Sequence, residues 1–338
     1  MKRRKGCILA FLFIFVAIGG VVLFRSGLFT SKPLVLRGHT QFISSLVFSP
    51  DGKLLASGST DGAVMLWNTH TGSLVRRLAG PTKAPWHLAF SPDGSTIADG
   101  DLNSNIILWN VSSGALIKTL PGHIGEVTGI EFSPNGKLLA TASHEKVATI
   151  WDIDKGKPIK QFWKHKNWVA PVAFSPDGNI LATGDYECIQ TWDVRTGKRI
   201  SKTPNPLNHW FRYSSDGSRL VTGGIYSQIK VWDTSTWQVT LSLADRVDTM
   251  DLSKDGRLIT GANLPEITVK VRDIKTGALI QRVEQSEGQT SWPGWILRLF
   301  PFIQPRQANA ISRVCISPDG KTAAVASSDR LIRLWKLR

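Results

Sequence analysis

The sequence predicts an all-β fold in which seven similar units, each a sheet of four short strands, close into a ring behind one N-terminal apolar helix. A turn motif of four residues recurs seven times, and alternating apolar residues flank each copy. Six of the seven units also place a tryptophan at a similar distance after the motif. Self-similarity with a period of roughly 40 residues is typical of a β-propeller.

The first 33 residues predict a membrane anchor. Residues 6–24 contain no charged side chain, and a helix of this length spans roughly 28 Å, close to the hydrocarbon thickness of a bilayer. Because residues 2–5 are all basic, residues 1–5 are expected to form a cytoplasmic tail and the large domain to lie across the membrane. Residues 25–33 would then be a linker. The alternatives are a cleaved signal peptide, which would release a secreted protein, and a buried helix.

The recurring turn motif is Ser-Pro-Asp-Gly or a close variant. It begins at Ser49, Ser91, Ser133, Ser175, Ser214, Ser253 and Ser317. Asp-Gly and Asn-Gly supply the positive φ that a tight hairpin turn needs. The alternating residues direct one face of each strand inward. Since a single four-stranded sheet cannot bury both faces, the units must stack on one another around an axis.

A tryptophan ends the second alternating run of most units. These tryptophans are Trp67, Trp109, Trp151, Trp192, Trp232 and Trp335, while the sixth unit has Arg272. Large indole rings at equivalent positions are suited to filling the space between neighbouring sheets. An aspartate follows at Asp152, Asp193 and Asp233, and Gly-His occurs at Gly38-His39 and Gly122-His123.

These dipeptides resemble those of the WD-repeat family. The resemblance extends over nearly all of residues 34–338. The resemblance implies a seven-bladed propeller that binds other proteins and is not an enzyme. It also implies a structural set of hydrogen-bonded side chains in each unit, namely a His, a Ser or Thr, an Asp and the Trp. The first unit matches with His39, Ser57, Asp61 and Trp67, and the third with His123, Thr141 and Trp151, where Glu145 takes the acidic position.

Ring closure is expected to use both ends of the domain. The chain ends at Arg338, three residues after Trp335, so the seventh unit has no fourth strand of its own. Leu34–Leu36 stands where a fourth strand would be, with no unit before it. This segment is therefore predicted to complete the last sheet, which removes the open sheet edges. The anchor would then join the propeller on the face opposite the loops that connect fourth strands to first strands.

An insertion separates the sixth and seventh units. The last step between turn motifs is 64 residues, against 39 to 42 for the others. The extra residues, about 284–307, are apolar and include Trp292, Trp295, Arg298 and Phe300. Long apolar loops often bind partners, so these four residues are candidate contacts. Packing on the propeller itself and insertion into a bilayer are the alternatives.

Other candidate contacts lie in the predicted loops between the fourth strand of one unit and the first strand of the next. They are Lys83, Trp86, Lys164, Lys166, Trp168, His209 and Trp210. Basic and aromatic side chains together suit a protein or an anionic peptide, lipid or polymer, and the alternative is that the tryptophans only pack between units. The net charge of +15 also favours anionic partners. Nucleic acid is not expected as a partner, because the propeller is predicted to lie outside the cytoplasm.

The sequence carries no recognised catalytic signature, such as a nucleophile elbow, a phosphate loop or a zinc-protease helix. Asp99–Asn105 alternates oxygen-bearing side chains as calcium loops do, but lacks their glycine and final glutamate. No metal or cofactor is expected. We therefore predict a monomeric, membrane-anchored interaction scaffold. The alternatives are a sensor of a polymer or ligand and a propeller enzyme, which would need at least two carboxylates within hydrogen-bond reach in the channel.

Overall fold

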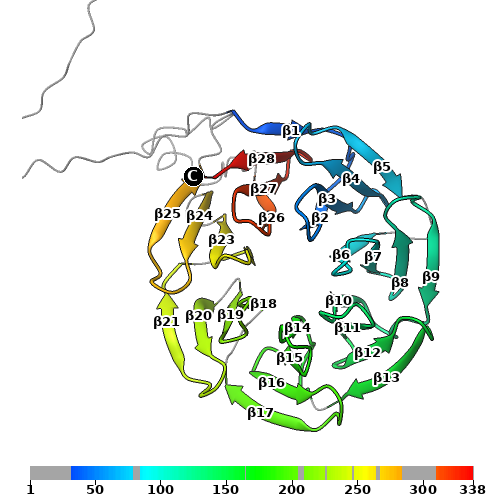
Figure 1. Cartoon of the computed structure of the whole chain (residues 1–338), viewed down its shortest axis with the longest axis vertical. Helices are drawn as coiled ribbons and strands as arrows, with labels where there is room; N and C mark the ends of the chain where they lie inside the picture. Colours follow the sequence, from blue (N-terminus) through cyan, green and yellow to red (C-terminus); the bar gives the residue numbers. More distant parts are fainter. Residues whose placement is uncertain are drawn as a thin grey trace, which may run out of the picture.

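The computed structural model describes residues 32–78, 84–163, 165–204, 209–224, 227–245, 247–263, 267–283 and 310–337. Their 28 strands form seven antiparallel four-stranded sheets arranged as blades around one axis (Figure 1). The predicted seven-bladed propeller is thus confirmed. Within these ranges, no helix has the length and apolar character needed to cross a bilayer.

In blades one to six the strands follow the chain from the axis outward, and in blade seven β1 is the outermost strand. Blade one contains β2 (Ile43–Phe48), β3 (Leu54–Ser59), β4 (Val64–Asn68) and β5 (Leu74–Leu78), and blade two contains β6 (Pro85–Phe90), β7 (Thr96–Asp101), β8 (Ile106–Asn110) and β9 (Leu116–Leu120). Blade three contains β10 (Val127–Phe132), β11 (Leu138–Ser143), β12 (Ala148–Asp152) and β13 (Lys157–Phe162), and blade four contains β14 (Val172–Phe174), β15 (Ile180–Gly184), β16 (Cys188–Asp193) and β17 (Arg199–Pro204). Blade five contains β18 (Trp210–Tyr213), β19 (Arg219–Gly224), β20 (Ser227–Asp233) and β21 (Val239–Leu243), and blade six contains β22 (Thr249–Leu252), β23 (Arg257–Ala262), β24 (Thr268–Asp273) and β25 (Leu279–Val283). Blade seven contains β26 (Ile311–Ile316), β27 (Thr322–Ser327), β28 (Ile332–Lys336) and β1 (Leu34–Leu36).

The seven turn motifs all connect the first strand of a blade to its second. In blade one the Ser49 hydroxyl donates a hydrogen bond of 2.6 Å to Asp51 Oδ1, and Gly52 adopts a φ of 71°. The equivalent serines bond to an Asp or Asn two residues later in the other six blades. This geometry explains why the motif needs a short polar side chain followed by glycine.

The ring closes as the sequence predicts. β1 pairs antiparallel with β28, with Leu34 opposite Leu334 and Leu36 opposite Ile332. Leu36 is buried and belongs to the same apolar cluster as Trp67 of blade one. The segment that follows the predicted linker is therefore the fourth strand of the last blade and also packs on the first blade.

Polar side chains on the innermost strands link neighbouring blades. Glu131 Oε2 accepts the backbone N–H of Phe174 at 2.8 Å, which joins blade three to blade four. Asp251 Oδ2 accepts the N–H of Ile316 at 3.2 Å, which joins blade six to blade seven. Such bonds satisfy backbone donors at the channel wall, where no further strand can pair with them.

Several predicted features lie outside the described residues. They are the tail at 1–5, the anchor at 6–24, most of the linker at 25–33, the insertion at about 284–307 with its four candidate contacts, and the loop residues Lys83 and Lys164.

Candidate functional site

The structural set of blade one is a chain of hydrogen bonds from the loop surface to the core. His39 Nδ1 lies 3.0 Å from Asp61 Oδ2, and His39 Nε2 lies 2.7 Å from Ser57 Oγ. Trp67 Nε1 donates to the same hydroxyl at 2.8 Å. Burial holds the pKa of His39 below its ordinary value, so the ring is neutral. With Nδ1 protonated, the Ser57 hydroxyl accepts from the indole and donates to Nε2, and every polar atom has a partner.

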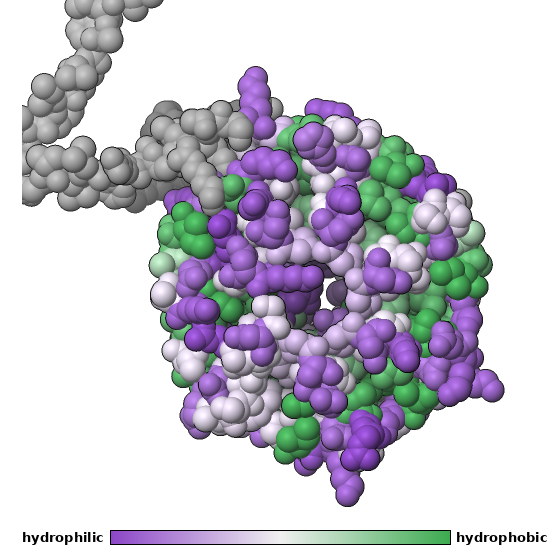
Figure 2. Space-filling model, in the orientation of Figure 1, coloured by the Kyte–Doolittle hydropathy of each residue, from purple (hydrophilic) through white to green (hydrophobic). Residues whose placement is uncertain are grey.

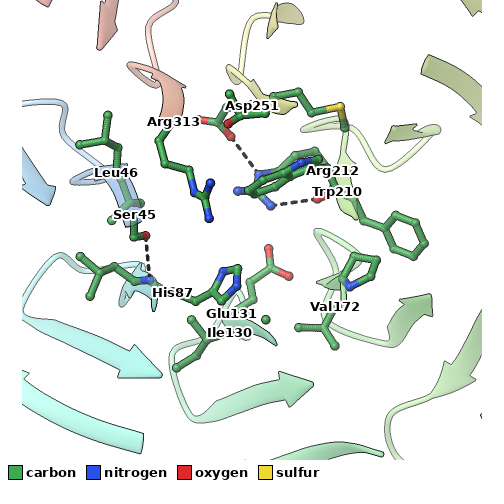
Figure 3. A pocket seen from close by; sticks show the side chains of 18 of the residues that line it. Ser45, Leu46, His87, Ile130, Glu131, Val172, Trp210, Arg212, Asp251 and Arg313 are labelled. Carbon is green, nitrogen blue, oxygen red and sulfur yellow. Dashed lines mark hydrogen bonds and ion pairs between the residues drawn. The ribbon is translucent and has the colours of Figure 1, made fainter. Parts of the chain in front are cut away.

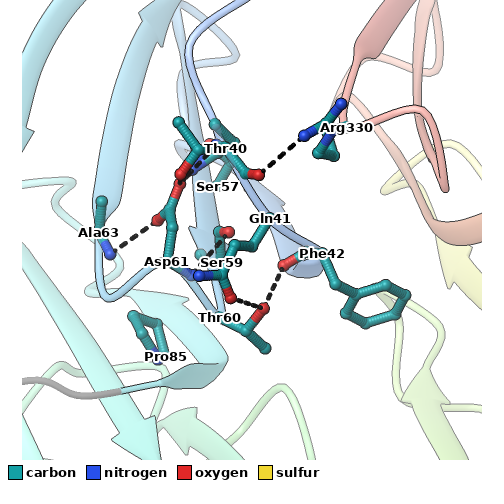
Figure 4. A network of polar contacts seen from close by, with 12 residues as sticks. Thr40, Gln41, Phe42, Ser57, Ser59, Thr60, Asp61, Ala63, Pro85 and Arg330 are labelled. Carbon is teal, nitrogen blue, oxygen red and sulfur yellow. Dashed lines mark hydrogen bonds and ion pairs between the residues drawn. The ribbon is translucent and has the colours of Figure 1, made fainter.

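Asp61 extends this set into the loops (Figure 4). Its carboxylate accepts the backbone N–H of Thr40 at 2.8 Å and that of Ala63 at 3.0 Å. Burial disfavours the charged carboxylate, but the N–H of Thr40 and the His39 ring outweigh it and hold the pKa of Asp61 below its ordinary value. The loop entering β2 is thereby fastened to the hairpin between β3 and β4.

Blades three and four contain the same kind of set. In blade three His123 lies 2.6 Å from both Glu145 and Thr141, and Trp151 donates to Thr141 at 2.8 Å. The set of blade four was not predicted from the sequence. Its members are His165, Thr183, Asp185 and Trp192.

One feature of the sequence could have indicated the structural set of blade four. The His stands 18 positions before the hydroxyl residue in all three sets. The carboxylate, however, follows two positions after Thr183, whereas it follows four positions after Ser57. The shorter hairpin in blade four displaces the acidic residue from its expected position, and no Gly precedes His165 to mark it.

Blade six replaces the tryptophan by an ion-pair cluster. Asp245, between blades five and six, binds Arg272 Nη2 at 2.7 Å and Lys270 Nζ at 2.5 Å. Burial opposes ionisation of Asp245, yet these two cations hold its pKa below the ordinary value. Arg272 also donates to the carbonyl oxygen of Gly277 at 3.0 Å. A shared carboxylate thus connects strands where an indole would otherwise fill the space.

The connections from outer to inner strands form one loop face. Among the described residues, its most exposed apolar side chains are Ile124, at 91%, and Trp163, at 57%, together with Trp168 and Phe42. Of these four, only Trp168 was a candidate from the sequence. The other exposed large apolar side chains among the described residues lie on the outermost strands. Apolar groups exposed in loops are suited to contact a partner.

Aromatic rings continue around this face as two groups. Phe42 stacks on Trp86 with ring centroids 6.3 Å apart. Trp168 stacks on His144 at 4.2 Å and contacts Tyr186 at 6.0 Å, which in turn contacts His209 at 5.7 Å. We call these two groups, with Trp210, the aromatic row. The structure thus brings Trp86, Trp168, His209 and Trp210 to one face.

Two of the predicted contact residues already interact with other residues of the propeller. Lys166 Nζ forms an exposed ion pair of 3.2 Å with Glu187. Trp210 packs on the core between blades five and six and donates Nε1 to the carbonyl oxygen of Asp248 at 3.2 Å. Trp210 therefore combines the packing role with a position at the channel mouth.

The axis is an open channel (Figure 2) with a cavity of about 380 Å³. Arg212, Arg313, His87 and Glu131 point into it from four different blades (Figure 3). Arg212 Nε donates to Asp251 Oδ1 at 2.9 Å. The channel is thus lined by charged groups, although the blades around it have apolar cores.

Burial in the channel shifts the protonation of these groups. Burial raises the pKa of Glu131 to about 7, against the attraction of Arg212. Burial, with the positive charges of Arg313 and Arg212, lowers the pKa of His87 to about 3. His87 is therefore neutral at pH 7. The hydrogen bond found for the Glu131 carboxyl group comes from the backbone N–H of Phe174.

The oxygen-rich hairpin between β7 and β8 is held by its own bonds. Asp101 Oδ1 accepts the N–H groups of Asn103 and Asn105 at 2.9 and 2.8 Å. Within the described ranges, no group of three His, Cys, Asp or Glu residues is arranged to hold a metal ion.

Seven similar blades, each with the same turn between its first and second strands, define the protein as a β-propeller made of sequence repeats. The chain belongs to the family of the WD domain, G-beta repeat, which matches it at residues 31–68, 72–110, 114–152, 156–193 and 302–336. The region between 193 and 302 holds blades five and six, where no full structural set is found among the described residues.

Two relatives match short stretches of the chain. Over 58 residues the chain is 45% identical to "WD repeat, SAM and U-box domain-containing protein 1" of Gallus gallus, which covers 17% of this chain and 12% of that protein. Over 40 residues it is 55% identical to "Protein Mut11" of Chlamydomonas reinhardtii, covering 12% of this chain and 11% of that protein. The chain thus spans about a tenth of each relative's length.

Proposed function

We propose that this protein is a membrane-anchored scaffold whose loop face binds another protein. WD-repeat propellers typically bind other proteins. The observation that carries the proposal is the gathering of exposed Phe42, Ile124, Trp163 and Trp168 in the loops of one face. Aromatic and apolar anchors of this kind supply most of the free energy of protein association.

The structural sets support this role because they hold the loops in place before a partner arrives. Asp61 fastens the loop of blade one through Thr40, and Glu145 accepts the N–H of Ile124 at 3.2 Å in blade three. A loop that is already ordered loses less conformational entropy on binding. The insertion at 284–307 is also a connection from an outer to an inner strand, so Trp292, Trp295, Arg298 and Phe300 would extend the same surface.

The anchor is the second part of the proposal. The basic residues at 2–5 and the uncharged run at 6–24 support a single span with the N-terminus in the cytoplasm. β1 begins at the end of its blade where third strands turn into fourth strands. The loop face is at the opposite end, so the anchor would leave it free.

A capture experiment tests the scaffold. The full chain and a variant with Trp163→Ala and Trp168→Ala would be cross-linked in membranes and purified with their partners. The matched control carries Leu116→Ala and Ile200→Ala, which are comparably exposed on outermost strands. We expect at least tenfold less of the captured proteins with the loop variant and no loss with the control. Equal capture by all three proteins would refute the loop face as the binding surface. A further variant that lacks residues 284–307 would measure how much the insertion contributes to binding.

A further inference from the structure

We propose that the channel mouth on the loop face is a binding site for an anionic group, and that Arg313 receives a carboxylate or phosphate carried on a side chain of a partner peptide. The proposal rests on the proposed function and specifies the chemistry of its partner.

The mouth is built by residues at the ends of inner strands nearest the loop face. Trp210 and Trp86 are the first and second residues of their strands, and Arg313 is the third of β26. The Arg313 guanidinium lies 5.4 Å from the centre of the Trp210 ring and 5.8 Å from that of Trp86. Contact with two indole rings restricts the side chain while its charge faces the channel (Figure 3). The site is therefore formed before a ligand arrives.

Arg313 points into the channel without an acidic partner in the described ranges, unlike Arg212 in the same cavity. No carboxylate of the described residues lies within ion-pair distance of it, whereas Arg212, Arg272 and Arg333 each bind an aspartate at 2.7 to 2.9 Å. The hydrogen bond found for its guanidinium runs from Nη1 to the carbonyl oxygen of Ser312, at 2.8 Å. Arg313 is partly buried. A cation that is partly withdrawn from water without a counterion is unfavourable, and an arriving anion would relieve that cost.

The surroundings favour an anion over a cation. A cationic ligand would be repelled by Arg313. Deeper in the channel the charge of Arg212 is offset by its ion pair with Asp251, and burial raises the pKa of Glu131 to about 7, which reduces its negative charge. The neutral His87 ring adds no opposing charge at the mouth. The planar guanidinium presents paired N–H groups that match the oxygens of a carboxylate or a phosphate. A narrow opening with low-dielectric walls concentrates this positive potential.

The dimensions favour a side chain as the ligand. A cavity of about 380 Å³ admits a glutamate or a phosphoserine but no folded domain. The aromatic row borders the mouth through Trp86 and Trp210, so it would contact the residues that flank the acidic one. An extended acidic or phosphorylated segment of a partner protein satisfies both features.

The test is calorimetric titration of the full chain with three capped hexapeptides. They share apolar flanking residues and differ at one central position, which is Glu, phosphoserine or Gln. We expect the Glu or the phosphoserine peptide to bind at least tenfold more tightly than the Gln peptide, and the better of the two identifies the anion. Binding should weaken as salt concentration rises.

Variants assign the effect to Arg313. Arg313→Gln should abolish the preference for the anionic peptide, and Arg313→Lys should retain part of it because the charge remains. Arg330→Gln is the matched control: Arg330 lies on the same face, where its guanidinium donates to the Thr40 carbonyl at 3.2 Å, and this variant should bind within twofold of the parent. Unchanged thermal unfolding would show that the variants are folded.

Three results would overturn the inference. They are equal binding of the Gln peptide, unchanged affinity of Arg313→Gln, and tighter binding of inorganic polyphosphate than of any peptide. Loss of capture in the Trp163 and Trp168 variant with no effect of Arg313→Gln would reject the anion site alone. The reverse pattern would reject the scaffold surface alone.

Discussion

A single hydroxyl stands at the centre of each structural set. Ser57, Thr141 and Thr183 each contact both an imidazole nitrogen and an indole N–H, and all three are fully buried. A hydroxyl can accept one bond and donate another, which a methyl group cannot. These residues therefore couple the loop face to the core through hydrogen bonds.

Replacing Thr183 by Val should destabilise the propeller by about 2–3 kcal/mol, because it leaves His165 and the Trp192 indole without their shared partner in the core. Chemical denaturation followed by circular dichroism measures the change. Thr119→Val removes an exposed hydroxyl on β9 and should change stability by less than about 0.5 kcal/mol. Equal effects of both substitutions would show that the buried hydroxyl has no special role.

Glu131 should make stability depend on pH. Its pKa of about 7 in the folded protein lies above its ordinary value of 4.5. The unfolded chain therefore releases this proton at lower pH, and the contribution of Glu131 to stability falls as pH rises from 4.5 through 7. His87 acts in the opposite direction, since its folded pKa is lowered and its contribution is lost as pH falls below 6.5.

Glu131→Gln isolates the first effect, because His87 remains in both proteins. The variant should match the parent near pH 4 and exceed it by about 1–2 kcal/mol at pH 8, where only the parent has a charged carboxylate at position 131. Denaturation at several pH values measures the difference. Glu187→Gln, at an exposed carboxylate that pairs with a lysine, is the control and should give a difference that does not grow with pH. A Glu131→Gln difference independent of pH would contradict the assignment.

Among the elements, one of the two shortest described strands, β1, has a large structural consequence. β1 contains three residues, yet it supplies the outer edge of blade seven and joins the first blade to the last. Leu36 contributes most, because it is only 2% exposed between Trp67 and Ile332. Closure therefore depends on apolar packing as well as on strand pairing.

Leu36→Ala should cost about 2–4 kcal/mol, since it leaves a cavity at the joint between the two ends of the ring. The same substitution at Leu116, which is 47% exposed on β9, should cost less than about 1 kcal/mol. Thermal unfolding gives both values, and limited proteolysis should cleave the Leu36 variant faster near the N-terminus. If the two variants were equally stable, β1 would not be needed for closure.

On the scale of the whole molecule, strand direction separates the two ends of each blade. The turn motifs and the turns into fourth strands lie at one end, while the loop face lies at the other. A single N-terminal span would attach at the first of these ends. The proposed binding surface and the proposed anchor would then be on opposite sides of one rigid ring.

Cysteine labelling tests the orientation. Cys188 and Cys315 are buried, and burial raises the pKa of both thiols, that of Cys188 to about 11, so they should not react. With Cys7→Ser as background, Thr119→Cys should react with a membrane-impermeant maleimide on intact cells, and Lys2→Cys should react only after permeabilisation. Labelling of Lys2→Cys alone would place the propeller in the cytoplasm. Absence of residues 1–33 from the mature protein would instead indicate a cleaved signal peptide.

The sequence by itself determined the number of blades, the position of every turn motif, the use of Leu34–Leu36 for closure and two of the three structural sets. These features depend on local spacing, which repeats along the chain and is therefore visible without a structure. Most strands also follow from alternation around those turns, since a half-buried strand places every second side chain inward.

Only the tertiary structure decided what meets at the axis. Glu131, Arg212 and Arg313 come from blades three, five and seven and lie within different repeats, so no local pattern relates them. The same holds for the contacts of Arg313 with Trp86 and Trp210, and for Asp245, which replaces the missing tryptophan of blade six through two cations. Spacing along the chain repeats from unit to unit, but contacts across the channel depend on the angle through which each blade is rotated about the axis.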